Sequence, residues 1–184
     1  MTMAVPATSR PSPRAYPGEQ ERPLRGLPST AAVLGHPIHP MLVPFPLAFL
    51  VGALATDLAA RATHDPFWSR ASAWLLGAGA VTGVVAGAVG SIDYLTVRRA
   101  RDHATGKIHA YGNGLALALA AANLLLRRNA SGPAPTSATL ALSALTAAVL
   151  GVTGWAGGEL SYREMVGVSG HGDQHTDEEK RYVR

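Results

Sequence analysis

Four long stretches of the chain almost entirely lack charged side chains, and they restrict the possible folds more than any other feature. Asp57 is the only Asp, Glu, Lys or Arg inside them, and they cover residues 41–60, 71–92, 110–126 and 137–158. A helix needs about 20 apolar residues to cross the roughly 30 Å hydrocarbon core of a bilayer. A helix of a soluble bundle would also show a polar face, and the second and fourth stretches show none. The sequence therefore predicts an all-α fold, an integral membrane four-helix bundle.

Polar segments flank this predicted bundle on both sides. Hydrophobic residues make up 47% of the chain and charged residues 15%, and the charges gather outside the four stretches. Residues 1–32 are rich in proline and polar residues and lack the apolar core of a signal peptide, so we expect a disordered N-terminal tail. We assign residues 33–168 to the transmembrane domain and residues 169–184 to a disordered, polar C-terminal tail.

The basic residues predict the orientation of the four spans. Twelve of the sixteen Lys and Arg residues lie in residues 1–32, 93–109 and 159–184, whereas four lie in the two remaining loops. Cytoplasmic loops carry the excess of basic residues in membrane proteins. We therefore expect a multi-pass membrane protein with both termini in the cytoplasm. The basic residues form no stripe with interleaved aromatic residues, so no nucleic-acid partner is expected.

Glycines at helical spacing predict which helix faces pack together. Small residues let membrane helices approach closely. The second predicted helix carries Gly79, Gly83, Gly87 and Gly90, of which the last three lie on one face. The fourth carries Gly151, Gly154 and Gly158 on one face.

Ionisable residues converge on the predicted cytoplasmic ends of all four helices. The motif "HPIHP" at residues 36–40 precedes the first helix, and its prolines are expected to hold both imidazoles on an extended segment folded over the end of the bundle. The candidate metal ligands at this end are His36, His39, Asp93, His109 and Glu159, with Tyr162 beside them. Such a donor set suits a transition metal such as zinc, iron or copper, and imidazole also ligates haem iron. The alternative is that these groups cap helices and pair with arginines.

The third predicted helix carries a polar stripe, and the first carries an isolated carboxylate. The residues His109, Asn113, Ala116, Ala120 and Asn123 follow one another at steps of three and four, so they share one face. Polar side chains are costly in lipid, and this face should look into the bundle. Asp57 lies towards the other end of the first helix. It is a candidate functional residue, and Arg61 at i+4 is its expected partner.

Several of these motifs resemble a bacterial family of predicted membrane proteins, the domain-of-unknown-function family 2231. The motifs are "GHPIHPMLVPFPLAFLVGALATDL", "GSIDYL", "HAYGN" and "GWAGGELSYREMVGV", within residues 33–168. The resemblance implies four spans in the inner (plasma) membrane of a bacterium. Some relatives are joined to Rieske-type iron–sulfur domains, which implies a redox setting. Because this chain has no cysteine, its redox partner would be a separate protein. Relatives often carry a further histidine where this chain has Glu164 and Met165, which would weaken a metal site here.

Three functions remain open at this point. The first is a metal-binding or haem-binding membrane protein with a role in electron transfer. The second is a non-catalytic scaffold or partner subunit, whose His and acidic residues only organise the helix ends. The third is one subunit of a small transporter, which would have to be a homo-oligomer because four spans are few. No motif of an acyl-transfer or phosphoryl-transfer enzyme is present, so we do not expect an enzyme of these classes.

Overall fold

The computed structural model describes residues 26–128 and 134–168. Its secondary structure is almost wholly helical. In chain order the elements are β1 (Ala32–Val33), β2 (His36–Pro37), α1 (Ile38–Leu42), α2 (Pro44–Thr63), α3 (Pro66–Thr96), α4 (Arg98–Asp102), α5 (Ala104–Arg128), α6 (Ser137–Gly158) and the π-helical turn η1 (Glu159–Arg163).

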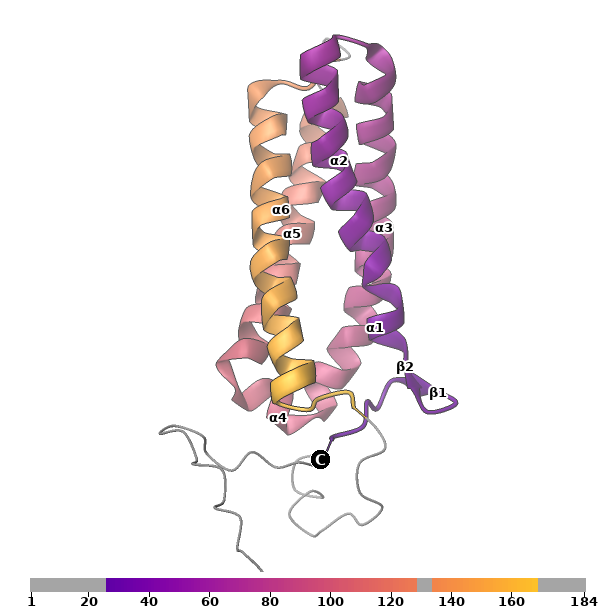
Figure 1. Ribbon diagram of the computed structural model, residues 1–184, viewed down its shortest axis with the longest axis vertical. Coiled ribbons are helices and arrows are strands. Elements are labelled where there is room, and N and C mark those ends of the chain that lie inside the picture. The colour runs from indigo at the N-terminus through magenta and orange to yellow at the C-terminus, as the bar shows by residue number, and fades with distance from the viewer. Residues whose placement is uncertain (1–25, 129–133, 169–184) are drawn as a thin grey trace, which may run out of the picture.

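The four long helices form an up-and-down bundle made of two helical hairpins (Figure 1). Helix α2 packs on α3 and α5 packs on α6, while contacts of α2 with α6 and of α3 with α5 join the two hairpins. Four helical stretches, counting α1 with α2 and α6 with η1, are long and apolar enough to cross a membrane. The predicted all-α membrane bundle is confirmed. Helix α3 has 31 residues and is about 46 Å long, which exceeds the hydrocarbon thickness of a bilayer.

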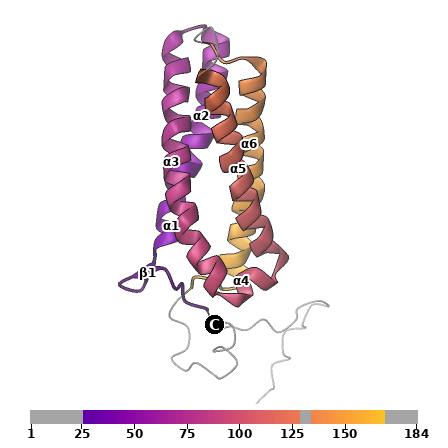
Figure 2. The ribbon, with the colours of Figure 1, turned by 180° about the vertical axis from the view of Figure 1, so that it is seen from behind.

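The two ends of the bundle differ in structure (Figures 1 and 2). We call the end with the α2–α3 turn and the start of α6 the loop end, and the end with β1, β2, α1, α4 and η1 the terminal end. At the loop end the Asp65 side chain accepts a hydrogen bond from the Phe67 N–H and so caps α3. The Thr136 side chain caps α6 in the same way by accepting from the Thr139 N–H.

The segment before the first helix packs across the terminal end. The Leu27 side chain is buried against Val97 and Ala100. The Leu27 N–H donates to the Met165 carbonyl over 2.8 Å, and the Leu27 carbonyl accepts from the Gly167 N–H over 2.8 Å. Residues 26–32 fall within the predicted tail, yet they are ordered by these contacts, whereas residues 1–25 and 169–184 lie outside the described chain.

The centre of the bundle is filled by small and medium-sized apolar side chains. The buried cluster consists of Leu50, Ala53, Leu76, Ala116, Ala120 and Leu150. The predicted glycine face of α3 is confirmed at Gly83, where a Cβ atom would lie 2.6 Å from Leu117. Gly79, outside that predicted face, is as close to Leu50, since a Cβ atom there would also lie 2.6 Å away. These two glycines allow the neighbouring helices to approach closely.

The predicted glycine face of α6 is wrong. A Cβ atom at Gly151 or Gly154 would meet no other atom within 4 Å, so these glycines face away from the bundle. Helix α6 instead packs through the buried residues Thr139, Ser143, Thr146, Leu150, Thr153 and Ala156. Hydroxyls such as that of Thr146 donate to a carbonyl of their own helix, here that of Leu142. Small polar residues can therefore replace glycine at a membrane helix interface.

Candidate functional site

Two imidazoles meet between the two helical hairpins, in the half of the bundle nearer the terminal end. The ring centroids of His39 and His109 are 5.8 Å apart and the rings are perpendicular, with an interplanar angle of 89°. His39 lies in α1 and His109 lies in the second turn of α5. The sequence predicted both residues as site residues, and the structure brings these two together.

Each ring is fixed by a backbone carbonyl of the helix that it faces. The His39 Nδ1 atom lies 2.8 Å from the Ala86 carbonyl oxygen of α3, and the His109 Nδ1 atom lies 2.8 Å from the Thr153 carbonyl oxygen of α6. A carbonyl oxygen can only accept a hydrogen bond, so Nδ1 carries the proton in both rings. In the neutral imidazole the Nε2 atom then keeps its lone pair and can ligate a metal.

A glycine lies four residues after each of these carbonyls and makes room for the ring. A Cβ atom at Gly90 would lie 2.7 Å from His39 Nδ1, and one at Gly157 would lie 2.9 Å from His109 Nδ1. The same arrangement of carbonyl and glycine therefore occurs once in each hairpin. The sequence pointed to Gly90 only as a packing residue and gave no sign of a role for Gly157, because the contacted carbonyls of Ala86 and Thr153 are known only from the structure.

The polar stripe of α5 faces the interior, as predicted. The Ala116, Ala120 and Asn123 side chains are buried. Asn113 donates from Nδ2 to the His109 carbonyl over 2.7 Å and accepts at Oδ1 from the Thr153 hydroxyl over 3.2 Å. Asn113 thus links the helix that carries His109 to the residue whose carbonyl holds the His109 ring.

The other predicted ligands are engaged elsewhere. The Nδ1 atom of the exposed His36 contacts the Leu34 carbonyl over 3.0 Å, and Glu159 pairs with Arg163 over 3.3 Å. The Asp93 carboxylate accepts from the Ser29 hydroxyl and from the N–H groups of Thr30 and Ala31. Tyr162 is largely exposed. Within the part of the chain that the structure describes, no three His, Asp or Glu residues are grouped to hold a metal ion.

The "HPIHP" motif is extended only in part. His36 and Pro37 form β2, but helix α1 begins at Ile38, so the prediction of an extended segment is wrong for His39 and Pro40. Pro40 is tolerated because the first turn of a helix needs no donor from it. The helical conformation turns His39 towards α3, whereas His36 stays in the hairpin.

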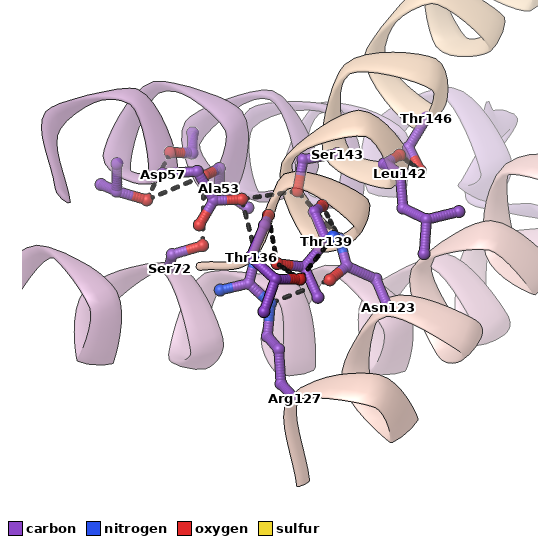
Figure 3. A network of polar contacts seen from close by, with 12 residues as sticks. Ala53, Asp57, Ser72, Asn123, Arg127, Thr136, Thr139, Leu142, Ser143 and Thr146 are labelled. Carbon is purple, nitrogen blue, oxygen red and sulfur yellow. Dashed lines mark hydrogen bonds and ion pairs between the residues drawn. The ribbon is translucent and has the colours of Figure 1, made fainter. Parts of the chain in front are cut away.

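A second polar site lies at the loop end, around Asp57 (Figure 3). Asp57 is completely buried, and its Oδ2 atom accepts from Arg127 Nη2 over 2.6 Å and from the Ser143 hydroxyl over 2.6 Å. The predicted partner, Arg61, is exposed. The expectation of an Asp57–Arg61 pair is therefore wrong, because Arg127 of α5 reaches the carboxylate across the bundle.

This site joins all four long helices. Asn123 donates from Nδ2 to the Ser143 hydroxyl and the Thr139 carbonyl, and its Oδ1 atom accepts from Arg127 Nε over 2.9 Å. Ser72 of α3 donates to the Ala53 carbonyl of α2. Two polar sites thus lie in the bundle, the imidazole pair towards the terminal end and the Asp57 network at the loop end. Both bonds to Asp57 go to its Oδ2 atom, and among the described residues its buried Oδ1 atom has no hydrogen-bond partner. A charge buried in a membrane is costly, and pairing with Arg127 offsets part of this cost.

Comparison with known proteins identifies the family of the chain but no individual similar protein. Searches of curated proteins and of solved structures find no match. The model of the family described as predicted membrane protein (DUF2231) matches residues 35–170, which include both polar sites. The motif resemblance and the four apolar helices agree with this match, and the chain belongs to the DUF2231 family of predicted membrane proteins.

Proposed function

We propose that this membrane protein binds haem between its two hairpins, that His39 and His109 would hold the haem iron, and that the protein transfers electrons. The observation that carries the proposal is the imidazole pair, in which both Nδ1 atoms contact a backbone carbonyl over 2.8 Å. Ligating histidines almost always donate their other ring N–H in this way, because the contact fixes both the tautomer and the ring orientation.

The number of available donors favours haem over a bare metal ion. Zinc takes four ligands in structural sites and three protein ligands in catalytic sites. Two imidazoles face each other here, and the carboxylates of Asp93 and Glu159 are engaged in other contacts. Haem supplies nitrogen ligands of its own to the iron, so two histidines would be enough to hold it here.

The ring separation is close to that of two imidazoles that share one metal ion. Two metal–nitrogen bonds of about 2.0–2.1 Å, together with the distance from each Nε2 atom to its ring centre, separate the centroids by about 6.4 Å. The observed separation is 5.8 Å, so the two rings would move apart by about half an ångström to admit the iron. Side chains from facing helices commonly build cofactor sites in the core of four-helix bundles, and these two histidines come from different hairpins.

The proposed setting is the bacterial inner membrane with both termini in the cytoplasm. The support is the excess of Lys and Arg in residues 1–32, 93–109 and 159–184. The imidazole pair would then lie in the cytoplasmic half of the bilayer. A separate redox protein, docking at the terminal end, would exchange electrons with it.

The optical spectrum of the detergent-purified protein tests this proposal. We expect a Soret band in the native chain and its loss in both His39→Ala and His109→Ala. His36→Ala is the matched control, because it removes the other histidine of the same motif and should keep the band. His109→Met should keep haem but shift the reduction potential upwards, since methionine ligation raises it.

A native chain that carries no haem after expression with a haem precursor would contradict the proposal. Elemental analysis of the same sample then separates the remaining functions. One equivalent of a transition metal that is lost in both alanine variants would indicate a two-histidine metal site. The absence of any metal would favour the second candidate, a non-catalytic partner subunit, which is supported by the structural roles of Asp93, His36 and Glu159.

A further inference from the structure

The β-hairpin at the terminal end has an unusual turn. Strands β1 and β2 pair Val33 with His36, and the two residues between them, Leu34 and Gly35, have φ angles of 51° and 79°. Positive φ at both central positions defines the tight hairpin turn that Asn-Gly or Gly-Gly makes most easily. This chain has leucine at the first position, where a side chain without a local hydrogen bond is strained.

The leucine at this turn is also almost fully exposed in the isolated chain. Leu34 is 93% exposed and its neighbour Val33 is 59% exposed. In water, an asparagine would relieve the backbone strain and remove the exposed apolar surface at the same time. A leucine at this position is favourable only where its side chain leaves water.

The hairpin lies where the membrane begins. The first candidate span starts at Ile38, directly after β2, so the chain from Leu34 to Ile38 reaches about 13 Å at most. Figures 1 and 2 both show the hairpin just below α1, projecting sideways from the bundle rather than along its axis. In a bilayer crossed by the bundle, this direction is parallel to the membrane surface. Met41 and Phe45, near the start of the span, also have exposed side chains.

The chemistry of the hairpin suits an environment that is poor in water. Residues 32–37, "AVLGHP", contain no charged side chain apart from the titratable His36. The Leu34 carbonyl at the tip contacts His36 Nδ1 over 3.0 Å, so this backbone acceptor is satisfied within the hairpin. Unpaired backbone groups are costly next to lipid, and His36 removes this cost for one of them.

We propose that Val33 and Leu34 form an apolar tip that inserts into the boundary between the headgroups and acyl chains of the surrounding bilayer. Apolar faces of interfacial segments typically enter this boundary by about 5–10 Å. The hairpin would anchor the start of the first span against tilting and fix the height of α1, which carries His39. The inference rests on the membrane-spanning bundle and does not depend on whether the protein binds haem.

Site-specific labelling tests this insertion cleanly because the native chain has no cysteine. Leu34→Cys is labelled with an environment-sensitive fluorophore and reconstituted into liposomes of phosphatidylethanolamine and phosphatidylglycerol. The control is the same label at Asp102→Cys, an exposed position at the same end of the bundle. We expect iodide in the buffer to quench the label at 34 several-fold less than the label at 102. Lipids with a quencher high on the acyl chain should show the reverse order.

Equal iodide quenching at positions 34 and 102 would overturn the proposal. Shielding that disappears when the protein is diluted in lipid would also overturn it, because a second copy would then cover the tip.

A second variant addresses any effect of labelling position 34 itself. In Val33→Cys/Leu34→Asn the turn is relaxed but the tip loses its leucine. Iodide quenching of the label at 33 should rise several-fold relative to Val33→Cys alone. An unchanged value, with unchanged helical circular dichroism, would show that Leu34 does not hold the tip in lipid.

Discussion

Asp57 of α2 and Arg127 of α5 form a buried ion pair that ties the first helical hairpin to the second. Their oxygen and nitrogen atoms are 2.6 Å apart, and the two residues are separated by 70 positions in the sequence. Ser143 of α6 binds the same carboxylate oxygen, and Asn123 binds both Ser143 and Arg127. The pair is therefore part of a network that fixes how the hairpins face each other.

Removing one member of the ion pair should destabilise the bundle. We expect Arg127→Leu to lower the free energy of unfolding by about 3–5 kcal/mol, because it leaves the buried Asp57 carboxylate without its counter-ion. Asp57→Asn should cost less, because Arg127 is partly exposed and keeps its hydrogen bond to Asn123. Thermal melts in detergent measure the loss. The double variant should lose less than the sum of the two single losses, since it removes both charges.

Arg61→Leu is the control for this comparison, because Arg61 is exposed and four residues from Asp57. Its stability should stay within about 0.5 kcal/mol of the native value. A loss as large as that of Arg127→Leu would mean that Asp57 pairs along its own helix after all.

Ser143→Ala should weaken the same network by a smaller amount. The hydroxyl donates to Asp57 and accepts from Asn123, so the substitution leaves a buried carboxylate and a buried amide each short of one partner. The expected cost is about 1–3 kcal/mol in a detergent melt. Ser91→Ala is matched to it, because the exposed Ser91 hydroxyl only bonds a carbonyl of its own helix. A loss in Ser91→Ala equal to that in Ser143→Ala would argue against a special role for the network.

The packing faces of α3 and α6 should respond differently to the same substitution. Gly83→Leu places a side chain against Leu117 and should cost about 1–3 kcal/mol by overpacking. Gly154→Leu meets open space and should change stability little. Parallel melts of the two variants provide the measurement. A larger loss in Gly154→Leu would indicate that another protein chain covers the outer face of α6.

Gly90→Ala tests the environment of His39 and rests on the proposed haem site. The added methyl group would lie 2.7 Å from His39 Nδ1, so the ring must turn away from the Ala86 carbonyl. We expect the variant to purify with less haem than the native chain, as judged by the ratio of Soret to protein absorbance. Gly151→Ala, which meets no neighbouring atom, serves as the control and should retain haem fully. Full haem content in Gly90→Ala would exclude His39 as a precisely held ligand.

Topology reporters test the predicted orientation. Fusions after residues 65 and 132 should report the side opposite to the cytoplasm, and fusions at residue 102 and at the C-terminus should report the cytoplasm. The reason is the distribution of Lys and Arg: twelve lie on the side predicted to be cytoplasmic and four lie on the other side. Cytoplasmic signals from the fusions at 65 and 132 would show that the bundle has the opposite orientation.

The sequence by itself determined the number and the approximate extent of the helices. Length and hydropathy are local properties, so the fourth stretch coincides with α6 at Ser137–Gly158. The inward face of α5 was also predictable, because this helix alone combines asparagines and a histidine with small residues at a regular spacing. Polar groups in lipid must turn inwards, and their periodicity therefore identifies the buried face.

Only the tertiary structure decided which groups meet. The apolar sequence of α6 carries almost no amphipathic signal, and its glycines pointed to the face opposite to the one that packs. In a membrane both faces of a helix can be apolar, so hydropathy cannot fix the rotation of the helix about its axis. The rotations of α2 and α5 about their axes decide that Asp57 pairs with Arg127 and not with its near neighbour Arg61. The contacts of His39 and His109 with the carbonyls of Ala86 and Thr153 also became visible only in the structure. They could not be predicted, because every residue has a backbone carbonyl and the sequence does not mark which one will accept.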